Sequence, residues 1–105
     1  MREISNPRLL AFEVLTEVEI NNLYSNIVLP QWLNRSNLSR EDRALATELV
    51  YGSLRMRGRH DSLISKVSTR SLGDIDQKVL ICLRIGIHQL TQMRIPSHAA
   101  IFETV

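Results

Sequence analysis

Three arginines stand close together near the middle of the chain, at Arg55, Arg57 and Arg59. Arg55 and Arg59 are four residues apart, so on a continuous helix they project from one face. Guanidinium groups fit phosphate oxygens and stack on bases, so the cluster could bind RNA. The alternative is a solvated helix end whose cations balance the negative end of the helix dipole. Tyr51, one turn earlier, could stack on an unpaired base, although burial is the expectation for this ring.

Basic side chains are distributed unevenly, although the formal net charge is only +2. Residues 35–70 contain eight basic and four acidic side chains, a local charge of +4, whereas residues 1–20 contain two basic and four acidic ones, a local −2. Only Lys66 and Lys78 of the 13 basic residues are lysines. The arginine bias favours a nucleic-acid partner, and genomic base composition explains it equally well.

Catalytic chemistry finds little support in the residue pattern. Cys82 lies in the most apolar segment, where a structural thiol is expected rather than a nucleophile. His60, His88 and His98 lack the spacing of metal ligands, and the four glycines stand singly, so no phosphate-binding loop is present. Arg84 and His88, four apart on a thin polar strip, are expected to form hydrogen bonds rather than to catalyse. We therefore predict no catalytic residue, no metal ligand and no cofactor site in this chain.

Length and composition indicate one globular domain over residues 1–105. No apolar run approaches the roughly 20 residues of a membrane span, so no membrane partner is expected. The N-terminus lacks the apolar region of a signal peptide, and a single cysteine fits a reducing compartment. The expected location is the cytoplasm.

The apolar spacing predicts an all-helical protein, and no alternating strand pattern occurs. The first helix begins with Asn6 as N-cap and Pro7 at its first position. A second helix runs from about Ser25, with Pro30 one turn inside it, so it is short, kinked or begins nearer this proline. Ser39 caps a third helix, with Asp42 at the capping-box position, and Gly58 is predicted to end it.

The C-terminal half predicts two further helices and the start of a sixth. A short fourth helix is expected around residues 61–70. Asp74 is predicted to cap the fifth, whose apolar residues on both sides indicate a central helix between others. The sixth begins after Pro96 and Ser97, and the sequence stops within its first turns, so the chain looks cut short. On one side of the fifth helix the expected apolar residues are Ile75, Val79, Leu83, Ile87 and Leu90, and on the other side they are Ile81 and Ile85.

Two segments resemble a known family. "DRALATELVYGSLRMRGRHDSLI" and "VLICLRIGIHQLTQMRIPSHAAIFETV" resemble the N-terminal NusB-like domain of the RsmB/Sun-type 16S rRNA cytosine-5 methyltransferases. In that family an Asp-Arg opening, a "TELVYG-LR" core and a following Asp recur, and then an "LRIG-YQL" helix, a Pro turn and an "ETV" helix start. The resemblance extends from Asn6 over essentially the whole chain. It implies the NusB fold, which agrees with a bundle of five helices plus the start of a sixth.

The resemblance also implies a function. The domain would bind ribosomal RNA and pack with its own methyltransferase domain, which is absent here and would carry S-adenosylmethionine and a nucleophilic cysteine. Nothing in this chain matches that catalytic domain, and Cys82 is not assigned its role. The candidate RNA-binding residues are Arg55, Arg57, Arg59, Arg43 and Arg8.

The chain departs from related patterns at two places. Phe102 stands where the family usually has Asn before "ETV". Free-standing NusB antitermination proteins have an Arg-rich first helix, whereas this one carries Arg8 and several glutamates. Two alternatives stay open: an antitermination-type module that binds RNA together with a ribosomal protein, and a purely structural docking domain.

Overall fold

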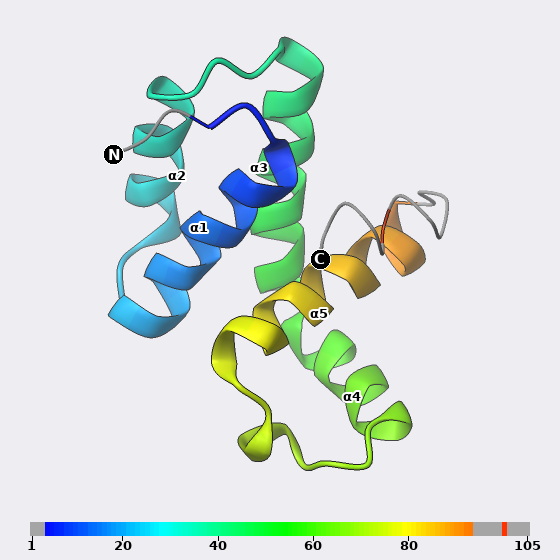
Figure 1. Cartoon of the computed structure of the whole chain (residues 1–105). Coiled ribbons are helices and arrows are strands. Elements are labelled where there is room, and N and C mark those ends of the chain that lie inside the picture. The colour runs from blue at the N-terminus through cyan, green and yellow to red at the C-terminus, as the bar shows by residue number, and fades with distance from the viewer. Residues whose placement is uncertain (1–3, 94–99, 101–105) are drawn as a thin grey trace. The chain divides into compact units, whose positions relative to one another are not determined.

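The computed structural model describes residues 4–93 and residue 100 (Figure 1). The predicted all-helical fold is confirmed, because the described residues form five α-helices and one short 3-10 turn, without a strand. No helix in this part of the chain has both the length and the apolarity needed to cross a membrane. The elements are α1 (Pro7–Asn21), α2 (Ser25–Asn34), α3 (Arg40–Arg55), α4 (Arg57–Val67), the 3-10 turn η1 (Leu72–Asp74) and α5 (Gln77–Gln92).

The chain divides into two compact units. The first, Met1–Tyr51, contains α1, α2 and most of α3. The second, Gly52–Val105, contains the end of α3, followed by α4, η1 and α5.

The start of α1 follows the prediction. The Asn6 side chain accepts hydrogen bonds from the backbone N–H groups of Arg8, at 2.9 Å, and Leu9, at 3.2 Å, and so satisfies two donors that the first turn leaves free. Leu10 and Val14, one turn apart, are completely buried. The helix ends at Asn21, and the C-cap residue Asn22 adopts the left-handed conformation (φ 58°) that asparagine tolerates better than most residues.

Helix α2 packs against α1 (Figure 1). It begins at Ser25 and continues through Pro30 to Asn34, so it does not begin at the proline. Pro30 is exposed, while Val28 and Trp32 are buried one turn apart. The Trp32 indole N–H donates to the Glu17 carboxylate at 3.0 Å, which adds one polar link to an otherwise apolar helix pair.

Helix α3 is capped as predicted, since the Ser39 hydroxyl accepts from the Asp42 backbone N–H at 3.2 Å. The prediction that Gly58 ends this helix is wrong. The backbone of Met56 (φ −99°, ψ 13°) leaves helical geometry, and α3 ends at Arg55. Gly58 instead occupies the second position of α4, where no atom lies within 4 Å of the site of a Cβ.

Helix α4 therefore begins four residues earlier than predicted and ends at Val67 rather than Arg70. The cap of α5 also differs from the prediction. Asp76, not Asp74, accepts from the first N–H groups of the helix, and the Asp74 carboxylate accepts from the Ser71 hydroxyl at 2.9 Å instead. The intervening residue, Ile75, is extended (ψ 132°), so the helix starts only after Asp76.

Helix α5 buries one face. Ile81 and Ile85 are buried, whereas Val79, Leu83 and Leu90 are exposed over 50%, 40% and 41% of their surface. The prediction of a helix covered on both sides is therefore wrong for these three residues. The predicted sixth helix, with His98 and Phe102, lies outside the described residues except for Ala100, which is helical and buried.

Candidate nucleic-acid interface

The three clustered arginines flank the break between two helices. Arg55 is the last residue of α3, Arg57 is the first residue of α4, and Arg59 is the third. All three are exposed, and Arg55 and Arg57 also make polar or electrostatic interactions within the protein. Because the helix is interrupted at Met56, Arg55 and Arg59 do not share one continuous helical face. The three arginines therefore lie on either side of the junction between α3 and α4, within the second unit.

The helix dipole separates these arginines into two kinds. Arg55 lies in the last turn of α3, where a cation stabilises the helix. Arg57 and Arg59 lie in the first turn of α4, where a cation opposes the dipole, and this turn has neither an acidic residue nor a side-chain cap. Balancing a helix dipole therefore explains Arg55 and fails to explain Arg57 and Arg59. A helix N-terminus flanked by two guanidiniums favours an anion.

The two units carry net charges of opposite sign. The described residues of the second unit carry seven basic and three acidic side chains, a net +4. Those of the first unit carry four basic and six acidic ones, a net −2. In the second unit Asp61 is paired with Arg84. Asp74 and Asp76 accept hydrogen bonds near the start of α5.

Two of the predicted RNA-binding residues lie in the other unit. Arg43, on α3, is half-buried, and its guanidinium donates to the carbonyl of Leu33 at the end of α2, at 2.8 Å. Arg8, the second residue of α1, is also half-buried and interacts within the protein. The second unit thus holds only Arg55, Arg57 and Arg59 of the five predicted residues.

Sequence reasoning did not select three further exposed cations of the second unit. Lys66 is in the last turn of α4, Arg70 follows that helix, and Lys78 is in the first turn of α5. The +4 charge of residues 35–70 already included the first two. Tyr51 on α3 was expected to be buried, and this is wrong, because 37% of its surface is exposed.

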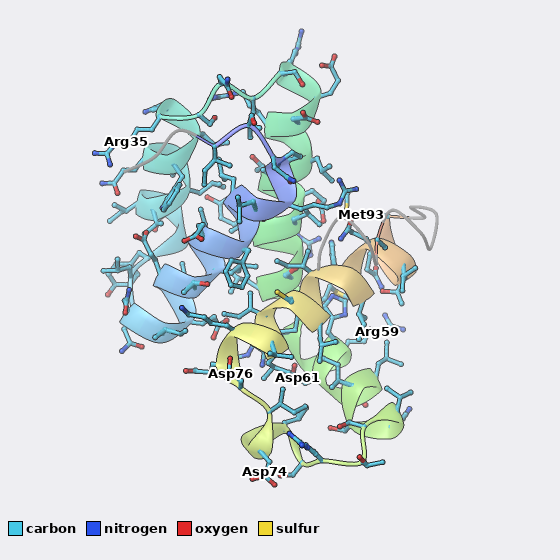
Figure 2. All side chains as sticks on the ribbon, viewed as in Figure 1. Arg35, Arg59, Asp61, Asp74, Asp76 and Met93 are labelled. Carbon is cyan, nitrogen blue, oxygen red and sulfur yellow. The ribbon has the colours of Figure 1, made fainter. Side chains whose placement is uncertain are left out.

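Two pairs of polar side chains join α4 to α5 within the second unit. The Arg84 guanidinium donates two hydrogen bonds to the Asp61 carboxylate, Nε to Oδ1 at 2.7 Å and Nη2 to Oδ2 at 3.0 Å. His60 Nε2 lies 3.0 Å from His88 Nδ1, with the rings edge to face. Asp61 is labelled on α4 in Figure 2, together with Arg59. The prediction that Arg84 and His88 form hydrogen bonds is confirmed.

Burial shifts the pKa of two side chains in this unit, His60 and Cys82. It lowers the pKa of His60 from 6.5 to about 4, mainly because the charged ring loses its hydration and next because His88 repels it. Burial also raises the pKa of the half-buried Cys82 thiol, which keeps this group protonated and unreactive at neutral pH. In the described part of the chain, no three His, Cys, Asp or Glu side chains are grouped as metal ligands.

An S-adenosylmethionine site does not fit the residues present. Such a cofactor rests against a glycine-rich loop, and the glycines here stand singly, with Gly58 in α4 and Gly86 in α5.

Comparison with known proteins connects this geometry to a family. Residues 5–105 match the model of the NusB family. The chain is 40% identical over 104 residues to a provisionally named methyltransferase of Mycobacterium tuberculosis. It is 37% identical over 100 residues to ribosomal RNA small subunit methyltransferase B of Pseudomonas syringae pv. tomato, and 35% over 106 residues to that of Escherichia coli O6:H1.

These matches cover most of this chain and a small part of each relative. They include 99%, 95% and 100% of the chain, but only 23%, 22% and 24% of the three relatives. The matched region is the N-terminal portion of the relatives. No solved structure matches the chain.

Proposed function

Since this chain belongs to the NusB family, we propose that it is the RNA-binding N-terminal domain of a 16S rRNA cytosine-5 methyltransferase. The domain holds ribosomal RNA while a catalytic domain elsewhere in the polypeptide uses S-adenosylmethionine. The names of the relatives and their N-terminal match support this assignment. Its partners are then ribosomal RNA and its own methyltransferase domain, and its location is the cytoplasm.

One observation carries the proposal: Arg57 and Arg59 occupy the first turn of α4, which has no side-chain cap. Each cation there costs the isolated helix about 0.3–1 kcal/mol through the dipole. A bound phosphate reverses that cost, because it meets the positive helix end and two guanidiniums together. Toward the α4 dipole, Arg57 and Arg59 are thus unfavourable in the free protein and favourable once the RNA backbone is bound.

The test is the double substitution Arg57→Glu with Arg59→Glu. Acidic residues suit the first turn of a helix, so α4 should remain at least as stable. Binding to 16S rRNA fragments at low salt should fall by a factor of about 10–100. The slope of log affinity against log salt concentration should decrease by about two, one for each lost phosphate contact.

A matched control is Arg40→Glu, compared with the single variant Arg59→Glu. Arg40 is exposed and begins α3, so the charge change and its position at a helix N-terminus are the same, but it lies in the acidic unit. This variant should bind RNA nearly as well as the parent protein. Unchanged RNA affinity in the double variant, with helix content retained, would contradict the proposal.

A second candidate, a docking domain, is favoured by the exposed apolar face of α5. Val79, Leu83 and Leu90 lie on one side of this helix and are 40–50% exposed. The occupant that fits the proposed enzyme is its own methyltransferase domain. Leu83→Asp should then lower methylation by the whole enzyme without changing the RNA affinity of this domain, whereas Arg59→Glu should lower the RNA affinity itself.

The antitermination alternative, with a ribosomal protein as co-partner, is disfavoured by α1. This helix carries Glu13, Glu17 and Glu19 against Arg8 alone, so it opposes an RNA backbone.

A further inference from the structure

The contact between α4 and α5 depends strongly on polar side chains. The buried residues of α4 are His60 and Ile64, so a single apolar side chain of this helix is fully withdrawn from water. His60 meets His88 on α5, and Asp61 meets Arg84 one turn earlier on the same helix. Loss of either polar pair would leave α4 weakly attached.

The surroundings of the histidine pair determine which ring nitrogens carry protons. At 3.0 Å between His60 Nε2 and His88 Nδ1, one proton lies between the two nitrogens, with one ring donating and the other accepting. Nδ1 of His60 is buried and has no hydrogen-bond partner among the described residues. A buried N–H without an acceptor costs more than a lone pair without a donor. The neutral pair therefore has His60 donating from Nε2 to His88.

A single added proton gives the two rings three N–H protons in total. One must stay between His60 Nε2 and His88 Nδ1, so the other two occupy His88 Nε2 and His60 Nδ1. The N–H at His60 Nδ1 is then a buried donor without an acceptor. This holds whichever ring is regarded as the charged one. A second added proton places two N–H groups head to head across 3.0 Å, which breaks the bond. Both rings are completely buried, so water does not relieve either state.

The surrounding charges also oppose protonation. His88 and Arg84 face His60 from α5, and Arg59 adds a positive charge from α4 itself. Among the described residues, only Asp61 attracts a proton to the ring, and its two oxygens are already held by Arg84. The pKa of His60 is accordingly lowered to about 4.

We propose that the His60–His88 pair is a proton-sensitive latch that keeps α4 docked on α5, and that its protonation opens this contact locally while the first unit stays folded. The geometry of the pair, its orphaned Nδ1 and the single apolar anchor of α4 carry the proposal. Because the opened state binds the proton near pH 6.5 and the closed state near pH 4, acid favours opening. The opening equilibrium constant should rise about 20-fold from pH 7 to pH 5.

Hydrogen exchange on the intact protein measures this opening directly. After correction for the intrinsic effect of pH on exchange, peptides from α4 should show the roughly 20-fold change between pH 7 and pH 5, whereas peptides from α1 should not. Equal changes in α1 and α4 would overturn the proposal, because they indicate global unfolding.

Two variants identify the responsible group. His60→Gln removes the titration and keeps a side chain that can hydrogen-bond to His88, so most of the pH dependence of α4 should disappear. Asp61→Asn removes the neighbouring carboxylate, and the pH dependence should persist. The reverse pattern would assign the effect to Asp61 and overturn the latch.

A measurement on the unmodified protein keeps the proposal testable if His60→Gln does not fold. The His60 ring resonances can be titrated while the α4 amides are monitored. The ring should titrate together with the loss of α4 protection. Complete titration of His60 with α4 still protected would overturn the proposal.

Discussion

The two units of this protein bury different kinds of side chain. In the first, the interior is apolar, with Leu10, Val14 and Leu49 completely buried. In the second, apolar and polar groups share the interior. All of the buried polar or charged residues of the described chain lie there: Ser53, His60, Arg84, His88 and Gln89.

The two units also differ in net charge. The first carries a net −2 and the second a net +4 over the described residues. An apolar interior gives stability that does not vary with proton binding, whereas a polar interior makes packing dependent on ionisation. Under the two proposals above, the first unit is a scaffold and the second is the binding and pH-responsive region.

The largest expected effect is on the apolar interior. Leu10→Ala removes a completely buried side chain from α1 and should lower the free energy of unfolding by about 3 kcal/mol. Denaturant titration at pH 7 and pH 5 should give the same loss at both. A loss that differs strongly between these pH values would contradict a purely apolar role.

A slightly smaller loss is expected at the ion pair of the second unit. Arg84→Met leaves Asp61 without its partner and should cost about 2–3 kcal/mol. This is below the value for a fully buried charge, because the Asp61 side chain keeps 21% of its exposure. Adding Asp61→Leu should recover much of the loss, since both charges are then gone. A double-mutant cycle that shows no coupling would contradict the pairing.

The sequence predicted the helix starts at which a cap is formed by adjacent side chains. Asn6 with Pro7, and Ser39 three residues before Asp42, need only a few adjacent side chains to act as caps, and the structure confirms them. Asp74 and Asp76 were harder to separate, because two acids close together both suit a helix start.

Contacts between distant residues could not be predicted in this way. The break at Met56 separates α4 from α3, and no residue type there demands it. The partners of Arg84 and His88 lie 23 and 28 residues away on α4, so the sequence indicated that they would be bonded but not to what. The positions of Arg57 and Arg59 relative to a helix dipole depended on that same break.

The pH dependence of the two units should also differ. With a pKa of about 4 in the folded protein and 6.5 in the unfolded chain, His60 binds a proton more readily when unfolded. Its contribution to stability is therefore complete above pH 6.5 and is lost as the pH falls toward 4. Between pH 7 and pH 5 the loss should be about 2 kcal/mol. Denaturant titrations of the parent protein and His60→Gln check this, and equal losses in both would assign the effect elsewhere.

The smallest effect tests why cations stand at both ends of α4. Arg59 is in the first turn and Lys66 in the last, so the helix dipole opposes one and favours the other. Arg59→Gln should raise the stability of the protein by about 0.5 kcal/mol, and Lys66→Gln should lower it by a similar amount. Precise thermal unfolding at low salt, where the dipole effect is least screened, measures both changes. Opposite signs, combined with a loss of RNA affinity in Arg59→Gln, would mean that this arginine is retained at the expense of folding. Equal signs would remove the electrostatic argument for an anion at this helix end.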